Sequence, residues 1–337
     1  MALVILGVTG YTGRLVLDEA RRVGLEVRLV GRRREALEDL AAAGEDVRVA
    51  DARDEAALRD AFDGASVVAS LAGPFLDVGL APVRAAIAAG AHYLDTSGEQ
   101  EWVARLHAEL RPETVVLPAF GFDYVPGDLA ARLAAEQVDG PLDEIVVAYS
   151  VKGVGTSRGT RRTIGHVLGQ KQVAWEGGRL VPSRFGATTR TIRFPFGERG
   201  VVEWGGAEPL TVPRHADVST VRSYIRAPSL AAKVGPIGRL AAPFVRLGSR
   251  LGPAGPSDAS RRKSRFAVVA EARGPAGEGR AVLAGTDVYG LTARLIVVGA
   301  QALEAAEARG TGVLAPAEAF DARTLAGRLE PFLTIVD

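Results

Sequence analysis

Short apolar runs alternate with amphipathic stretches over the first 125 residues of the chain. The apolar runs have the length of buried strands, and the amphipathic stretches have the spacing of helices. The expected strands are Leu3–Leu6, Val27–Val30, Val47–Ala50, Ser66–Leu71, His92–Leu94 and Val115–Leu117. The expected helices are Thr12–Val23, Arg34–Ala43, Glu55–Phe62, Leu80–Ala89 and Gln100–Leu110. This alternation predicts an α/β fold with a doubly wound parallel sheet of the Rossmann type.

The pattern changes near residue 140, where strands of mixed alternation and Gly-Gly turns follow one another. The expected strands are Ile145–Val151, Thr189–Phe194, Val218–Ile225, Arg265–Ala272 and Arg280–Ala284, with helices near Gly159–Gly169 and Leu230–Leu251. They predict a second α+β domain with a mainly antiparallel sheet. We expect the Ala-rich helix Tyr289–Arg309 to return to the first domain. The expected domains are therefore 1–138 plus 286–337, and 139–285.

The composition and the motif content of the sequence exclude several classes of protein function. The chain has no Cys, which excludes disulfides, zinc-thiolate sites and thiol nucleophiles. No uncharged apolar run approaches the ~18 residues of a spanning helix, and no leader pattern precedes Gly7, so we expect a cytoplasmic protein. No HExxH, paired-carboxylate or Ser-His-Asp spacing is present, so we expect neither a metal site nor hydrolase chemistry.

Charge is distributed unevenly along the chain. Residues 1–151 carry a net charge of −11, residues 152–265 a net +15 and residues 266–337 a net −3. The basic middle third could recruit an anionic partner, such as an acidic carrier protein or a membrane lipid, or could pair with the acidic first domain. Its stretch Ile237–Leu251 has helical spacing and could be a core helix or a membrane- or acyl-contacting one. The low content of aromatic residues argues against nucleic-acid binding by this region.

A glycine cluster lies between the first strand and the first helix, with the spacing GxxGxxG. Such a turn lets backbone N–H groups approach a pyrophosphate at the positive end of a helix. The alternative is a glycine-rich turn that binds nothing. The candidate cofactor residues here are Gly7, Thr9, Gly10, Tyr11, Thr12 and Gly13.

The end of the second strand indicates which nucleotide is bound. An NAD site usually has an acid there for the ribose hydroxyls, whereas this strand ends in Gly31, Arg32, Arg33 and Arg34. An arginine at this place can pair with a 2′-phosphate. We therefore predict NADP(H), with Arg32 as the first candidate and Arg33 as the second. The alternative is a solvated basic helix start.

Two further strand ends complete the predicted cofactor site. Asp51 and Ala52 follow the third strand, where adenine commonly lies, although Asp51 could instead cap the next helix. The uncharged residues Leu71, Ala72, Gly73 and Pro74 follow the fourth strand and suit the nicotinamide ribose. Ligands bind at the carboxyl ends of strands in such sheets.

Hydride transfer needs little from the protein beyond positioning and charge stabilisation, although a proton donor for the developing negative charge is useful. Tyr124 is the first catalytic candidate, although such a ring is also a common packing residue. Asp123 is the second, with a helix N-cap as its alternative. His166 is the third, because it follows a basic, glycine-bearing segment that could meet a phosphate or carboxylate, or be a solvated surface. Tyr289 could also line the cleft.

An ordered series of motifs resembles the saccharopine dehydrogenase-like oxidoreductases, and within them the bacterial trans-acting enoyl reductases. The series comprises Gly7–Gly13, Val30-Gly31-Arg32, Ala72–Phe75, Gly90–Glu99 and Gly121–Asp128, with later similarity at Tyr289–Ala293 and Gly312–Ala317. The resemblance implies a nicotinamide-binding domain, an α+β substrate domain and a returning helix. The middle of the chain lacks the amino-acid clamp of the saccharopine-forming enzymes.

We therefore expect an NADP(H)-dependent oxidoreductase that reduces an activated C=C (enoyl) or C=N bond in a small-molecule or acyl substrate. An acidic carrier could present that substrate, and peripheral membrane contact and a homodimer remain open. A protein of another class is the alternative: a non-catalytic dinucleotide-binding or membrane-associated protein that keeps the fold. Consumption of NADPH in the presence of candidate substrates distinguishes the reductase from the non-catalytic protein.

Overall fold

The computed structural model describes residues 2–153, 172–226 and 255–336. Contacts divide the chain into two units, each built from three segments. The first unit is Met1–Ser97, Trp102–Phe122 and Tyr289–Leu314, and the second is Gly98–Glu101, Asp123–Val288 and Ala315–Asp337. The expected helices near Gly159–Gly169 and Leu230–Leu251, together with His166, lie outside the described residues.

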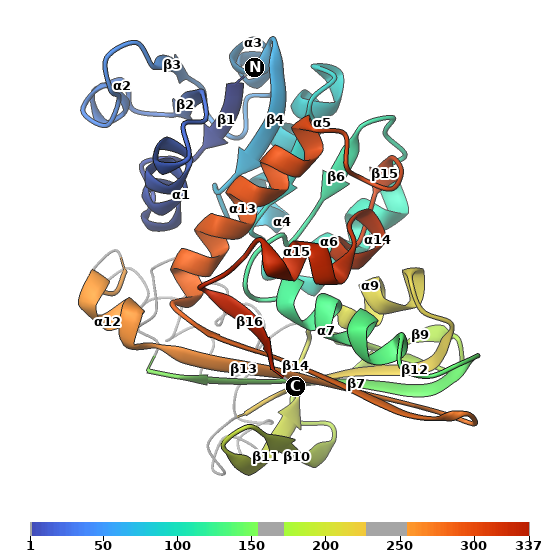
Figure 1. Cartoon of the computed structure of the whole chain (residues 1–337). Coiled ribbons are helices and arrows are strands. Elements are labelled where there is room, and N and C mark those ends of the chain that lie inside the picture. Colours follow the sequence, from blue (N-terminus) through green and yellow to red (C-terminus); the bar gives the residue numbers. More distant parts are fainter. Residues whose placement is uncertain (1, 154–171, 227–254, 337) are drawn as a thin grey trace. The chain divides into compact units, whose positions relative to one another are not determined.

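Parallel strands form the sheet of the first unit, as the alternation of apolar runs predicts. The strands are β1 (Ala2–Leu6), β2 (Val27–Gly31), β3 (Asp46–Val49), β4 (Ala65–Ser70), β5 (His92–Asp95), β6 (Val115–Leu117) and β15 (Gly312–Val313). Their order is β15-β6-β5-β4-β1-β2-β3, with parallel pairing throughout. The doubly wound parallel sheet predicted from the sequence is confirmed (Figure 1).

Helices cover this sheet with their apolar faces. They are α1 (Tyr11–Arg22), α2 (Arg34–Glu38), α3 (Glu55–Phe62), α4 (Phe75–Val78), α5 (Leu80–Ala88), α6 (Gln100–Glu109) and α13 (Val288–Glu304). Leu58, Val83 and Trp102 join one buried cluster with strand residues such as Val68. The last helix, α13, lies beside α1, where Arg294 Nη1 is 3.1 Å from Glu19 Oε1 (Figure 1). Helix α2 ends earlier than the predicted Ala43, because a turn begins at Asp39.

A buried carboxylate fixes the end of β5 in the first unit. Asp95 accepts hydrogen bonds from the N–H groups of Ser97 (3.0 Å) and Ala119 (2.7 Å) and from Trp102 Nε1 (2.7 Å). Burial raises the pKa of Asp95, although these donors oppose the shift. The three donors compensate a carboxyl group that would otherwise be costly to bury. Together they hold the β5 end against the loop that follows β6.

The second unit contains a mixed sheet with mainly antiparallel pairing. Its strands are β7 (Leu142–Lys152), β8 (Gln172–Glu176), β9 (Arg179–Ser183), β10 (Thr189–Phe194), β11 (Gly197–Glu203), β12 (Val218–Ile225), β13 (Arg265–Gly274), β14 (Gly277–Thr286) and β16 (Leu333–Val336). The order is β10-β11-β12-β7-β13-β14-β16, and β8 pairs with β12 and β9. In the part of the chain that the structure describes, β12 and β7 form the one parallel pair of this sheet.

Short helices and one longer helix accompany this sheet. They are α7 (Val125–Ala135), α9 (Glu208–Thr211), the 3-10 turn η1 (Val212–Arg214), α12 (Asp258–Lys263), α14 (Pro316–Ala319) and α15 (Ala322–Gly327). Helix α7 packs on β7, β13 and β14, whereas the β10–β11 hairpin lies against the opposite face (Figure 1). Ile192, Phe194 and Val201 of the hairpin pack there on Val146 and Val269.

The boundaries of the two units differ from 138 and 286. Helix α7 belongs to the second unit because its apolar face covers the second sheet. Residues 315–337 belong there too, because β16 pairs with β14 through contacts such as Leu283 with Ile335. Both assignments depend on pairings between residues far apart in the sequence.

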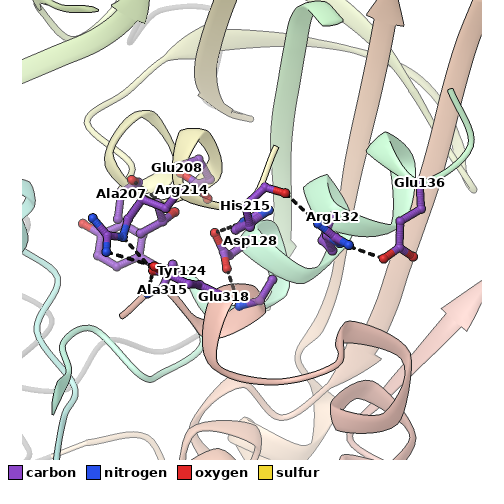
Figure 2. Close-up of polar contacts among 12 residues, drawn as sticks. Tyr124, Asp128, Arg132, Glu136, Ala207, Glu208, Arg214, His215, Ala315 and Glu318 are labelled. Carbon is purple, nitrogen blue, oxygen red and sulfur yellow. Dashed lines mark hydrogen bonds and ion pairs between the residues drawn. The ribbon is translucent and has the colours of Figure 1, made fainter. Parts of the chain in front are cut away.

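A second buried carboxylate joins three segments of the second unit (Figure 2). Asp128 on α7 is fully buried, hydrogen-bonds to His215 Nε2 at 3.0 Å and accepts the N–H of Ala317 at 2.8 Å. Beside it, Arg214 Nε donates to Glu318 Oε2 at 2.6 Å. These bonds attach the segment after η1 and the start of α14 to α7.

We predict that Asp128→Asn lowers the free energy of unfolding by about 1–3 kcal/mol at neutral pH, because a buried bond is lost or reversed. Burial opposes ionisation, but His215 and the N–H of Ala317 outweigh it and lower the pKa of Asp128. The stabilisation is therefore present above the unfolded-state pKa and is lost as the pH falls through the folded-state pKa. Urea unfolding at neutral and acid pH measures it.

Glu136→Gln is the matched control, because Glu136 is the C-cap of the same helix and its side chain is 46% exposed. We expect a change within about 0.5 kcal/mol there. An equal loss of unfolding free energy in both variants would show that the buried contacts of Asp128 stabilise the fold no more than an exposed ion pair does.

Candidate functional site

The glycine turn at the end of β1 is closed by backbone contacts. Gly7 has a φ of +85°, and its carbonyl accepts the N–H of Gly10 at 2.9 Å. A Cβ on Gly13 would lie 2.4 Å from the Gly7 oxygen and 2.7 Å from the Cα of Val8. A side chain at position 13 would therefore force the helix away from the strand. Only glycine allows α1 to begin this close to β1, with its N-terminus at the end of the strand.

The first turn of α1 suits an anion. Gly10 is its N-cap without a side-chain bond, and no acidic residue lies in the first turn. The first N–H groups of a helix have no intrahelical acceptor and carry a partial positive charge. Thr9, Tyr11 and Thr12 are partly exposed around this end. Tyr11 also contacts the ring of Tyr289 from α13, with centroids 5.1 Å apart.

The ends of β1, β2 and β4 lie together. A Cβ on Gly7 would approach the nitrogen of Ala72 and the carbonyl carbon of Leu71 to 3.1 Å, and the N–H of Gly7 donates to Val30 at 3.0 Å. Leu71, Ala72 and Pro74 are partly exposed, and Gly73 is exposed. The structure thus brings the candidates Gly7–Gly13 and Leu71–Pro74 to one accessible edge of the sheet.

The basic end of β2 faces the end of β3. The Arg32 side chain is 69% exposed, and its Nη1 lies 3.8 Å from Asp51 Oδ2, a long contact that a ligand phosphate can replace. Gly31 is buried, and Arg33 is the N-cap of α2 without a side-chain cap bond. The alternative reading of Asp51 as a helix cap is wrong, because Asp54 accepts the N–H of Ala57 and caps α3. Asp51 and Ala52 stay accessible beside Arg32.

The catalytic candidates Asp123 and Tyr124 have opposite environments. Tyr124 is buried, and its hydroxyl donates to the carbonyl of Gly98 at 2.8 Å. Burial raises the pKa of Tyr124 well above its usual value. Asp123 is exposed, yet desolvation by the protein around it raises its pKa to about 6. Asp123 is not the N-cap of α7, since that position is Tyr124.

A third acid, Glu208, was missed by sequence reasoning. It is fully buried and accepts the hydroxyls of Tyr149 and Ser223, each at 2.6 Å. Burial raises the pKa of Glu208 to about 7, although both hydroxyls oppose the shift. The segment Ala207-Glu208-Pro209 carries no local signal of burial, because its partners come from distant strands.

Known proteins match this chain in its first unit and in its fold. Residues 3–117 match the model of the saccharopine dehydrogenase NADP-binding domain. Residues 3–117 of the chain are thus similar to the NADP-binding domain of saccharopine dehydrogenases. The predicted resemblance to saccharopine dehydrogenase-like oxidoreductases and the predicted cofactor class are thereby confirmed.

Two curated relatives and one solved structure extend the comparison. A Caenorhabditis elegans lipid droplet localized protein is 30% identical over 42% of this chain and 38% of its own length. A trans-acting enoyl reductase of Mycobacterium ulcerans is 31% identical over 56% of this chain and 49% of its own length. The chain thus spans half or less of these relatives.

The solved structure is saccharopine dehydrogenase (L-Glu forming) from Saccharomyces cerevisiae. The match covers all of both chains with a TM-score of 0.63 and 12% identity, which shows a shared fold. No helix among the described residues is long and apolar enough to cross a bilayer.

We predict that Arg32→Ala in the NADP-binding domain weakens NADPH binding about tenfold and leaves NADH binding unchanged. The reason is the loss of one charge-assisted contact to the 2′-phosphate. Titration of both coenzymes measures the effect. Arg34→Ala is the control, because Arg34 is also exposed but pairs with Glu38 at 3.4 Å. Unchanged NADPH affinity in Arg32→Ala would contradict the assignment.

We predict that Glu208→Gln changes how stability depends on pH. The folded-state pKa of about 7 lies above the ordinary 4.5, so the native state holds its proton more tightly than the unfolded state. The stability of the parent relative to Glu208→Gln should therefore be greatest below pH 4.5 and fall as the pH rises to about 7. The fall is on the order of 3 kcal/mol.

Urea unfolding across this pH range measures the difference. Glu278→Gln is the control, because Glu278 is an exposed carboxyl in the same unit. Its effect should stay within about 0.5 kcal/mol at every pH. A pH-independent difference for Glu208→Gln would refute the raised pKa.

Proposed function

We propose that the chain is an NADPH-dependent reductase that transfers hydride to an activated C=C or C=N bond. The observation that carries the proposal is the accessible edge of the NADP-binding domain. There the glycine turn, the end of β4 and the basic end of β2 meet. The name of the M. ulcerans relative favours an enoyl substrate among the possibilities.

Each part of that edge has a role in the proposal. The first turn of α1 binds the pyrophosphate, because Gly13 lets the helix approach the strand and leaves N–H groups directed outward. Arg32, with Arg33 beside it, binds the 2′-phosphate. Asp51 and Ala52 border the adenine, and Leu71–Pro74 border the nicotinamide ribose. The bound cofactor supplies the hydride.

Asp123 is the proton donor that we favour. Reduction of a polarised double bond leaves an electron pair on the atom beside the one that receives hydride, and that atom takes a proton. An exposed carboxyl group with a pKa near 6 is partly protonated under ordinary conditions. Tyr124 is a weaker candidate, because its hydroxyl is buried and bonded to Gly98. We assign it the role of positioning the loop before α7.

The substrate class and its delivery form the finer part of the proposal. We infer an acyl substrate that an acidic carrier presents, because residues 152–265 carry a net +15 that would attract such a partner. We also propose that the protein is located in the cytoplasm. The names of two relatives place them at lipid droplets and in mitochondria.

We predict that the protein oxidises NADPH in the presence of enoyl thioesters or cyclic imines, and that Asp123→Asn lowers kcat about 10²-fold or more. The proton donor must be protonated, so kcat of the parent should fall as the pH rises above about 6. The variant should lose this fall. Initial rates of NADPH consumption across pH measure both effects.

Tyr124→Phe is the matched control, because it removes only the hydroxyl of the adjacent ring. We expect a smaller loss of kcat and an unchanged pH profile. Tight NADPH binding with no turnover of enoyl thioesters, cyclic imines or 2-oxo acids would contradict the proposed function. An unchanged pH profile in Asp123→Asn would refute its role alone.

A further inference from the structure

One face of the second sheet changes character along its strands. Antiparallel partners present their side chains on the same face, so pairing defines rows that run across β7, β13, β14 and β16. The first row is Ala148, Val269, Val282 and Val336. The next row is Ser150, Ala267, Ala284 and Thr334, and the last is Lys152, Arg265 and Thr286. The face thus proceeds from apolar, through small, to cationic side chains.

The β10–β11 hairpin covers the apolar row and leaves a hollow beyond it. Ile192, Phe194 and Val201 pack on that row, including Ala148 and Val269. The small side chains of the next row form the floor of a pocket of about 1580 Å³. We call it the outer-face pocket and define it by Ser150, Lys152, Phe196, Arg265, Ala267 and Ala284. A binding site for one drug-sized molecule is roughly 300–1,000 Å³, so this pocket accommodates a longer ligand.

The lining of the outer-face pocket is basic. Among the described residues it includes five cations, Lys152, Arg190, Arg199, Arg226 and Arg265, and no Asp or Glu. Arg190 pairs with Glu144 outside the lining. No carboxylate of the described residues lies within ion-pair distance of the other four. The sequence segments 154–171 and 227–254 contain no Asp or Glu.

Two of these cations oppose each other. Lys152 and Arg265 are direct cross-strand partners, and both are exposed. Like charges directly opposite each other destabilise a sheet. An anion placed between them removes that repulsion and accepts hydrogen bonds from both. The pair is therefore a suitable seat for a phosphate or carboxylate group.

An aromatic cluster borders the pocket. The ring of Phe196 is 47% exposed and stacks on Phe194 with centroids 5.4 Å apart. The guanidinium of Arg199 lies 5.4 Å from the centre of the Phe196 ring. A large exposed aromatic side chain beside cations suits a ligand with both an apolar and an anionic part.

We propose that the outer-face pocket binds one molecule of a phosphate-headed acyl lipid. The phosphate lies between Lys152 and Arg265, and the acyl chain follows the floor of small side chains towards Phe196. A recessed floor favours an inserted chain over a folded acidic protein, which would need a continuous flat surface. The inference does not depend on the proposed reductase activity, since the pocket lies within the second unit.

The test measures binding of oleoyl lysophosphatidate, below its micellar concentration, to the full chain by native mass spectrometry and calorimetry. Glycerol 3-phosphate supplies the head alone, and monooleoylglycerol supplies the acyl chain without charge. We expect lysophosphatidate to bind at least about tenfold more tightly than either, because each lacks half of the contacts. Equal binding of glycerol 3-phosphate or of monooleoylglycerol, or no binding of lysophosphatidate, overturns the proposal.

Two variants locate the site. The double variant Lys152→Glu with Arg265→Glu should weaken lysophosphatidate binding about tenfold or more. Phe196→Ser should weaken it without affecting the head-only probe. The control is Arg179→Glu with Arg184→Glu, two exposed cations of the same unit outside the pocket lining. Equal affinity in the parent and the Lys152/Arg265 variant overturns the proposal.

The same spectra and a coenzyme titration separate the alternatives. NADPH affinity should be unchanged in all of these variants, so failure of lipid binding is distinguishable from failure of the nucleotide assignment. One outcome would overturn the lipid assignment in favour of a second copy of the chain. The protein would form a dimer that does not bind lysophosphatidate, and the double variant Lys152→Glu with Arg265→Glu would be monomeric.

Discussion

The carbonyl oxygen of Gly7 occupies the space that a side chain on residue 13 would need. This single contact allows α1 to start directly at the end of β1, and it sets the direction in which the helix N-terminus points. The ends of β2 and β4 then join the same edge through Val30 and Ala72. The predicted nucleotide site is a consequence of this close backbone approach. In our proposal, Arg32 adds only a preference between two coenzymes that share a pyrophosphate.

Local patterns predicted the first unit well, because its strands and helices follow one another and pair with near neighbours. The predicted strands of the parallel sheet all lie where the structure has them, within one or two residues. The strand β15 was not predicted, since two residues carry no periodicity. The glycine turn and Arg32 could be chosen as cofactor candidates because their signal is a local spacing next to a strand end. Whether these residues bind the cofactor remains a prediction.

The strand pairing of the second unit could not be predicted from local sequence patterns. Its core depends on pairings such as Ala267 with Ser150 and with Ala284, which no short window of sequence contains. The same is true of the buried carboxylates, whose partners come from distant segments: Asp128 meets His215 and Ala317, and Glu208 meets Tyr149 and Ser223. The excess of positive charge was visible in composition, but the placement of Lys152 opposite Arg265 follows from strand register.

The chain passes between the two units five times, because each unit is assembled from three segments. Helix α13 and strand β15 of the first unit are synthesised only after β14 of the second. On a translating ribosome, the parallel sheet must therefore wait for its last helix and edge strand until residues 123–288 have emerged. The second unit waits in turn for β16. Neither unit corresponds to one continuous segment of the chain. The folding of each unit during synthesis therefore depends on segments that follow parts of the other unit.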